Sequence, residues 1–270
     1  MAAGNKLRID IGIVVLLIVL GLFAVLEFLI VSGVINPYVH TILCYAGIVV
    51  ISALGLNLIY GYTGQFSLGH AAFYGIGGYT AALVTRSIAA QGLWVLPLGL
   101  LAGALTAGAI ALQIGLPILR LKSDYLGIAT LGFGMIINVL FKNSDKLIKA
   151  MGGAAGMRGI ERLTTFPWVF IFCLRAVIVL RNLVFSGVGR ALISIREDEL
   201  AAEAVGVNAT SYKTLGFVIG CMFAGVAGGL YAHLYTYLNP DNFDFLKSID
   251  VLLIVVIGGL GSISGTIIAG

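Results

Sequence analysis

The stretch GYTGQFSLGHAAFYGIGGYTAAL, residues 61–83, combines features that an ordinary lipid-facing helix lacks. It holds six glycines together with three tyrosines, a glutamine and a histidine. Glycine weakens a helix, and polar side chains are costly in contact with lipid. Small and polar residues in one place therefore indicate either close packing between helices or an interrupted helix beside a site.

The composition of the whole chain places this stretch in a membrane protein. Of its 270 residues, 60% are hydrophobic and 10% are charged, and the mean hydropathy is +1.07. Soluble domains carry about 25% charged residues. We therefore predict an all-α, polytopic transmembrane bundle that forms a single domain over residues 1–270. The net charge of +4 is spread over loop ends, so we expect membrane lipid and no nucleic acid as a partner.

A hydrocarbon core of about 30 Å requires roughly 20 apolar residues per helix, and eight segments meet that requirement. The first apolar run is too long for a cleaved signal peptide, so we interpret it as a span. The last run ends at Gly270 without a closing polar residue, and we expect the natural chain to continue. Asp250, near the start of that run, is expected to cap its helix. The predicted spans are residues 11–31, 40–60, 66–85, 93–119, 124–141, 166–185, 213–238 and 249–269.

Four polar residues surround the glycines of residues 57–70 and are candidates for lining a translocation path. They would be costly facing lipid, so they should face protein, water or a passing solute. A second interpretation is a turn at residues 61–64 that places the same side chains at a helix interface. The sequence leaves both alternatives open. The four residues are Asn57, Gln65, Ser67 and His70.

Glycine pairs at GxxxG spacing also occur outside this stretch. They allow two helices to approach closely, and packing is favoured over a binding role for them. In addition, FYGIGG at residues 73–78 is similar to FAGVAG at residues 223–228, as in the internal repeats of transporters. The pairs are Gly99 and Gly103, Gly216 and Gly220, Gly225 and Gly229, and Gly261 and Gly265.

The longest polar connection is residues 186–212, SGVGRALISIREDELAAEAVGVNATSY. Asp198 can cap a short helix at its start, and Gly206 can end that helix. The acidic residues 197–199 would be repelled by anionic lipid, so a surface that docks to a protein is favoured over one that floats on the membrane. Lysine and arginine are divided almost evenly between the two sets of loops, which leaves the orientation undecided.

Three motifs, in this order, resemble the permease family of ATP-binding-cassette importers for branched-chain amino acids, of the LivM type. They are GLNLIYGYTGQFSLGHAAFYGIGGYTAAL (55–83), GRALISIREDELAAEAVGVNATSYK (189–213) and VVIGGLGSISGTIIAG (255–270). The resemblance covers roughly residues 40–141 and 186–270. It is weaker over residues 142–185, where Arg175 stands in the middle of a predicted span.

The resemblance implies a multi-pass permease in the inner membrane of a prokaryote that forms the translocation path and supplies no energy. The implied partners are a second homologous permease subunit, two cytoplasmic ATPases that use ATP, and a periplasmic or extracellular solute-binding protein. Residues 186–212 would be the cytoplasmic coupling loop and residues 142–165 would be external. The match to the importer motif EAA-x-x-x-G is partial. The implied coupling-helix residues are Arg196, Glu197, Glu199, Glu203, Ala204 and Gly206.

Two alternatives to branched-chain amino-acid transport remain open. Permeases for urea or short amides share much of this signature. A membrane-embedded enzyme is the alternative from another class, but the three histidines form no HExxH pair, and no GxSxG or GxxxxGK[ST] motif is present. We therefore expect no enzymatic activity, metal site or cofactor in this chain. A proton-coupled carrier would need a buried acid pair or acid–histidine relay, and we find no such pattern.

Overall fold

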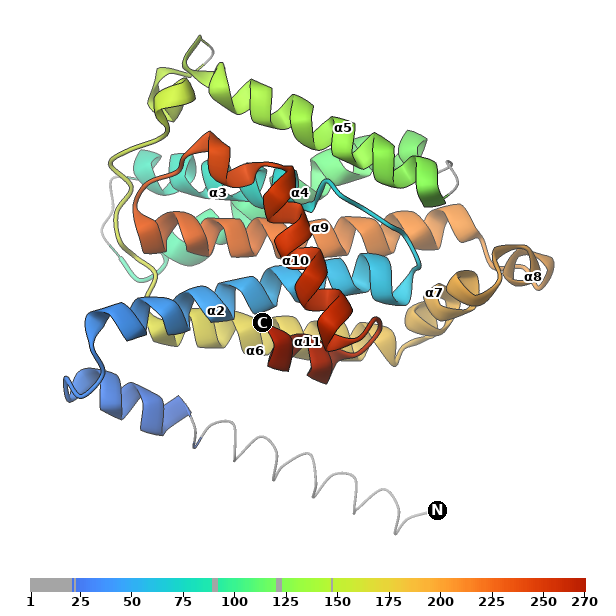
Figure 1. The fold of residues 1–270 in the computed structure, drawn as a ribbon, viewed down its shortest axis with the longest axis horizontal. Helices are drawn as coiled ribbons and strands as arrows, with labels where there is room; N and C mark the ends of the chain where they lie inside the picture. The colour runs from blue at the N-terminus through green and yellow to red at the C-terminus, as the bar shows by residue number, and fades with distance from the viewer. Residues whose placement is uncertain (1–20, 22, 89–91, 120–122, 147) are drawn as a thin grey trace.

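The computed structural model describes residue 21 and residues 23–88, 92–119, 123–146 and 148–270. Within these ranges the regular secondary structure is helical, apart from one isolated bridge between Met157 and Leu238, and irregular segments connect the helices. Long helices lie roughly side by side, and shorter ones connect or cross them (Figure 1). Five of the described helices are long and apolar enough to cross a membrane. The predicted all-α membrane bundle is therefore confirmed.

The helices occur in a simple order along the chain. Residues 23–31 form the first described helix. The following elements are α2 (Pro37–Leu56), the π-helix η1 (Asn57–Tyr62), α3 (His70–Ser87), α4 (Val95–Ile118), α5 (Ser123–Lys142), the 3₁₀ turns η2 (Ser144–Lys146), η3 (Lys149–Met151) and η4 (Gly153–Ala155), α6 (Phe166–Val184), α7 (Gly187–Glu197), α8 (Glu199–Ala204), α9 (Ala209–Tyr235), η5 (Pro240–Phe243), α10 (Phe245–Gly258) and α11 (Ile263–Ala269).

Most predicted spans correspond to observed helices. The five candidate spans are α2 continued by η1, then α4, α5, α6 and α9. The predicted span 66–85 corresponds to α3, but α3 begins only at His70. Residues 63–69, which precede it, are not helical. The predicted span 11–31 lies largely outside the described residues.

The last predicted span, residues 249–269, is wrong as a single helix. It divides into α10 and α11 at a turn in which Gly259 and Gly261 have φ of 93° and 77°. That backbone conformation favours glycine, so the helix ends there. The predicted capping role of Asp250 is also wrong. The cap of α10 is Asp244, whose carboxylate accepts a hydrogen bond from the Lys247 amide at 3.1 Å.

The centre of the bundle is α9, which packs against α2, α3 and α4. Glycines on three of these helices meet backbone to backbone. A β-carbon added to Gly225 would lie 2.7 Å from the carbonyl oxygen of Gly103, and one added to Gly103 would lie 2.6 Å from that of Gly77. Such approaches leave no room for side chains. The glycine-rich stretch of residues 61–83 therefore supplies α3 to the most tightly packed part of the protein.

The other glycines of the predicted pairs are in similar surroundings, with one exception. Gly261 lies in the turn between α10 and α11, where its positive φ is the decisive feature. The packing role of the others remains a prediction that the contacts support. An added β-carbon would meet Thr85 at Gly99, Thr63 at Gly216, Ile59 and the Gly55 carbonyl at Gly220, Leu100 and Ala81 at Gly229, and the Gly258 carbonyl at Gly265.

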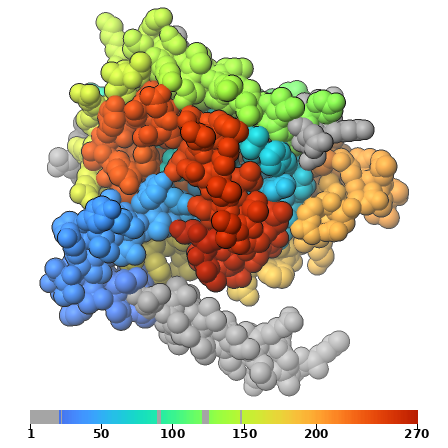
Figure 2. Space-filling model, in the orientation of Figure 1, coloured from blue at the N-terminus to red at the C-terminus, as the bar shows by residue number. Residues whose placement is uncertain are grey.

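The two ends of the bundle carry different connections. The turns η2 to η4 lie at one end, whereas α7 and α8 lie at the other and protrude from it (Figures 1 and 2). Helices that cross the membrane separate these two ends, so residues 142–165 and 186–212 lie on opposite sides of the bundle. Between them, α10 and α11 lie across the face that Figure 2 presents.

Candidate functional site

Asn57 fastens the end of α2 to the turn between α10 and α11. Its amide nitrogen donates to the Ser262 carbonyl oxygen at 3.0 Å and to the Thr266 hydroxyl at 2.8 Å. Its amide oxygen accepts from the Gly261 backbone N–H at 2.9 Å. The Asn57 side chain is fully buried. Every hydrogen bond it forms here goes to protein, which supports the interface interpretation for this residue over a place on the path.

The non-helical segment that follows is held by two further helices. The Leu68 amide donates to the Thr130 hydroxyl of α5 at 3.0 Å. The Ala71 amide donates to the Ser248 hydroxyl of α10, also at 3.0 Å. These bonds satisfy backbone groups that no helix satisfies, which is required where irregular backbone lies at membrane depth.

His70 and Ser67 are buried in the same region. His70 Nε2 lies 3.0 Å from the Ser52 carbonyl oxygen in α2, so this nitrogen carries the proton and donates. Both residues are 2% exposed or less. His70 therefore bridges α3 and α2, which again supports the interface interpretation. The role of Ser67 and His70 on a translocation path stays a prediction.

Gln65 differs from the other three predicted path residues. It is 3% exposed, and neither polar atom of its amide has a hydrogen-bond partner in the described part of the chain. It lines a cavity of about 240 Å³ together with Thr63, and the opposite wall carries Arg196 and Lys213. Gln65 is thus the predicted path residue that the fold brings to a cavity, between residues 63–65 and the loop 186–212.

The loop 186–212 contains the expected short helix and one that the sequence analysis missed. α8 begins after Asp198, whose carboxylate accepts from the Ala201 amide at 3.0 Å, and the chain leaves it through Gly206 at φ 88°. α7 precedes it, capped by Ser186. The signal for α7 was present, because Ser186 is a good cap and Leu192 and Ile195, which are buried, follow at helical spacing.

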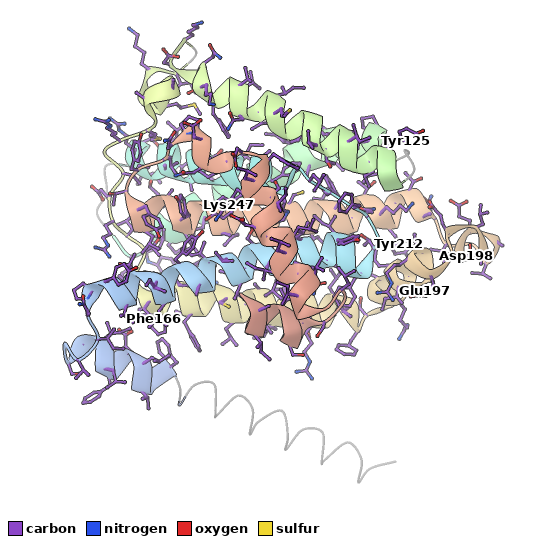
Figure 3. The ribbon with its side chains drawn as sticks, viewed as in Figure 1. Tyr125, Phe166, Glu197, Asp198, Tyr212 and Lys247 are labelled. Carbon is purple, nitrogen blue, oxygen red and sulfur yellow. The ribbon has the colours of Figure 1, made fainter. Side chains whose placement is uncertain are left out.

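Two of the predicted coupling residues, Arg196 and Glu199, hold this loop against the bundle. Arg196 Nη1 donates to the Gly61 carbonyl oxygen of η1 at 2.7 Å. The same guanidinium forms an ion pair with Glu197, and Glu199 forms one with Lys213 of α9. Figure 3 shows Glu197 and the neighbouring Asp198 at the protruding end of the molecule. Arg196 and Glu199 therefore join the loop to the helices behind it, whereas Glu197 pairs with Arg196 within the loop.

The remaining predicted coupling residues, Glu203, Ala204 and Gly206, are exposed. Beside them, the structure exposes two large apolar side chains, Leu200 at 78% and Val205 at 80%. An apolar pair on a protruding segment is typical of a protein contact. Sequence reasoning passed over both residues. The available signal was that Leu200 and the buried Ala202 must lie on opposite sides of so short a helix.

Catalytic and metal chemistry gain no support from the histidines. His233 Nδ1 lies 2.7 Å from the Gly229 carbonyl oxygen, and Nε2 lies 2.9 Å from the Thr85 hydroxyl, so the ring joins α9 to α3. Among the residues that the structure describes, no group of three His, Cys, Asp or Glu side chains could hold a metal ion.

Replacing Asn57 with leucine is expected to lower the free energy of unfolding by about 1–3 kcal/mol. The change leaves the buried Gly261 N–H without its acceptor, and an unsatisfied buried group has a cost of that order. Denaturation of the purified chain in mixed micelles measures the effect. Asn143→Leu is the matched control, because the exposed Asn143 side chain bonds only to near neighbours along the chain, the Val139 carbonyl and the Lys146 ammonium. Equal stability of the two variants would contradict the role given to Asn57.

Comparisons with known proteins identify the family. A family model described as the permease component of the branched-chain amino acid transport system matches residues 38–270. The chain is 34% identical over 257 residues to the high-affinity branched-chain amino acid transport system permease protein LivM of Salmonella typhimurium. This alignment covers 82% of the chain and 59% of LivM, so the chain spans well under two thirds of that relative. The LivM protein of Escherichia coli K12 matches equally, at 34%.

More distant relatives carry similar names. The permease protein BraD of Pseudomonas aeruginosa is 27% identical, covering 81% of the chain and 77% of BraD. The permease protein LivH of Escherichia coli K12 is 26% identical, with the same coverage. No solved structure gives a significant match. The match over residues 38–270, the identity to LivM and the bundle of apolar helices agree. The chain therefore belongs to the permease family of branched-chain amino acid transport systems, a family of non-enzymatic transport permeases.

Proposed function

We propose that this chain is the membrane-spanning permease subunit of an ABC importer for branched-chain amino acids and that it lines the translocation path. Separate ATPase subunits would supply the energy from ATP, so the chain itself would hold no cofactor. The observation that carries the proposal is the hydrogen bond from Arg196 to the Gly61 carbonyl, which joins the protruding loop to η1 within the signature region of a permease.

A contiguous set of contacts supports a coupling role for the loop 186–212. An ATPase that docks on α8 would press on a segment fastened to α9 by the Glu199–Lys213 pair. Arg196 passes that displacement to η1, and Asn57 of η1 is hydrogen-bonded to the turn between α10 and α11. Movement at the docking surface would thus reach α10 and α11.

The proposed partners follow from the two ends of the bundle and from the relatives. Both LivM and LivH are similar to this chain, which supports a pair of homologous permease subunits. Two cytoplasmic ATPases would contact α8 through Leu200, Glu203 and Val205. A periplasmic or extracellular solute-binding protein would contact the opposite end, near residues 142–165. In this arrangement the chain would lie in the inner membrane of a prokaryote.

The affinity-tagged chain, purified from its host with the subunits that accompany it, tests the function. Reconstituted in liposomes, the complex is expected to take up leucine, isoleucine or valine only with ATP and the binding protein present. The chain alone should neither hydrolyse ATP nor transport, because no phosphate-binding loop is present in its sequence. ATP-independent uptake by the chain alone would indicate a secondary carrier. Uptake of urea or a short amide instead of leucine would favour the alternative solute class.

A further inference from the structure

A groove of about 320 Å³ lies between α2 and α10. Its walls include the apolar side chains of Ile42, Val49 and Ile254. Tyr45, Lys247 and Asp250 also line it. A groove that combines aliphatic walls with a few polar groups has the character of a small-molecule site.

One polar group of this groove, Tyr45, lies in a helix long and apolar enough to cross a membrane, and Lys247 contacts it from α10. Lys247 Nζ donates to the Tyr45 hydroxyl at 2.5 Å and lies 5.1 Å from the centre of its ring. Tyr45 belongs to the span Pro37–Tyr62, about 12 Å along the helix from Pro37. In Figure 3, Lys247 lies away from both ends of the bundle. A charge at such depth is costly and usually marks a path for a solute or ion.

Asp250 adds the opposite charge one helical turn away. Residues three apart on a helix are neighbours, with β-carbons about 5–6 Å apart. In the described part of the chain, the Lys247 ammonium and the Asp250 carboxylate are not paired with each other. Their charged groups can therefore both face a third molecule in the groove.

We propose that this groove binds the α-amino-carboxylate group of the transported solute inside the membrane. Lys247 and the Tyr45 hydroxyl hold the carboxylate, Asp250 holds the ammonium, and Ile42, Val49 and Ile254 contact the aliphatic side chain. The inference rests on the proposed function, because it takes an amino acid as the solute. A zwitterion needs one cationic and one anionic partner close together, whereas urea and short amides need neither.

The first test measures uptake by the complete complex with Lys247→Met and Asp250→Asn. Each variant loses one charge-assisted contact, so uptake at subsaturating leucine should fall about tenfold or more with a raised KM. ATPase co-purification and basal ATP hydrolysis should be unchanged. Lys142→Met is the matched control, because Lys142 pairs with the exposed Asp241 at the end of α5, and it should behave as wild type.

The second test does not depend on the charge variants folding. In a background without the native cysteines, Ile254→Cys should react with a charged thiol reagent, and leucine should protect it while urea should not. Ile136 is on the exposed, apolar face of the candidate span α5, which we expect to face lipid, so Ile136→Cys should not react. An unreactive Ile254→Cys, or one that leucine leaves unprotected, overturns the site.

The proposed solute site and the proposed function would be contradicted by different results. If the wild-type complex transports amino acids but Lys247→Met and Asp250→Asn transport normally, the groove is not the solute site and the proposed function stands. If the wild-type complex transports no amino acid, the proposed function and this site fall together. If the second permease subunit instead covers the groove tightly, Ile254→Cys will be unreactive in the complex and reactive in the isolated chain, which also overturns the site.

Discussion

Replacing Gly228 with valine is expected to prevent the bundle from folding, with a loss of about 3 kcal/mol or more. A β-carbon at Gly228 would overlap the carbonyl oxygen of Tyr74 and lie 3.0 Å from the Gly78 amide. Both neighbours are backbone atoms of α3 and cannot turn aside as a side chain could. The helices α3 and α9 would have to separate, and the contacts that join α9 to the rest of the core would be lost.

The yield of monodisperse protein in detergent and the free energy of unfolding in mixed micelles measure this effect. Gly132→Val is the matched control, because it is the same substitution inside another apolar helix, α5, where nothing lies within 4 Å of an added β-carbon. The control should change the stability by no more than about 0.5 kcal/mol. If Gly228→Val is as stable as Gly132→Val, the close crossing of α3 and α9 is not what holds the core together.

Replacing Arg196 with methionine is expected to uncouple ATP hydrolysis from transport. The variant loses the hydrogen bond to the Gly61 carbonyl but keeps the apolar stem and the exposed face of α8. The ATPase should therefore still bind and hydrolyse ATP, while leucine uptake per ATP falls about tenfold. Hydrolysis and uptake measured on the same liposomes give this ratio directly. A normal ratio in Arg196→Met would remove Arg196 from the coupling route.

Two further sets of variants separate coupling from docking. Arg190→Met, on the exposed face of the same helix α7, is the matched control and should leave the ratio unchanged. Leu200→Asp with Val205→Asp should instead release the ATPase during purification, because each buries a charge at the proposed contact. The three outcomes differ in which subunit is retained and in how much ATP is hydrolysed.

The fold class and the short helix of the loop 186–212 could be predicted because their causes are local. Hydrocarbon burial depends on composition and on runs of about 20 apolar residues. The helix from Asp198 to Gly206 depends on a capping carboxylate and on a glycine exit, both of which act within one helical turn. Such features are visible in a stretch of ten residues.

The division of residues 249–269 could not be predicted in the same way. The segment is mostly apolar, and its glycines are compatible with a packed helix as well as with a turn. The turn exists because Asn57, 204 residues away, accepts the Gly261 N–H and donates to the Ser262 carbonyl. The same bonds explain why the sequence could not decide whether Asn57 lines a path or an interface. Its partners belong to the far end of the chain.

The sequence by itself determined that this protein lies in a membrane, that it is helical, and where the short helix α8 begins and ends, because these properties follow from composition and from neighbours along the chain. Only the tertiary structure decided which polar residues meet. It turned Asn57 and His70 toward protein, left the Gln65 amide beside a cavity, and placed Lys247, which lies between two predicted spans, against Tyr45 of α2. These positions depend on packing between distant helices, which no local pattern contains.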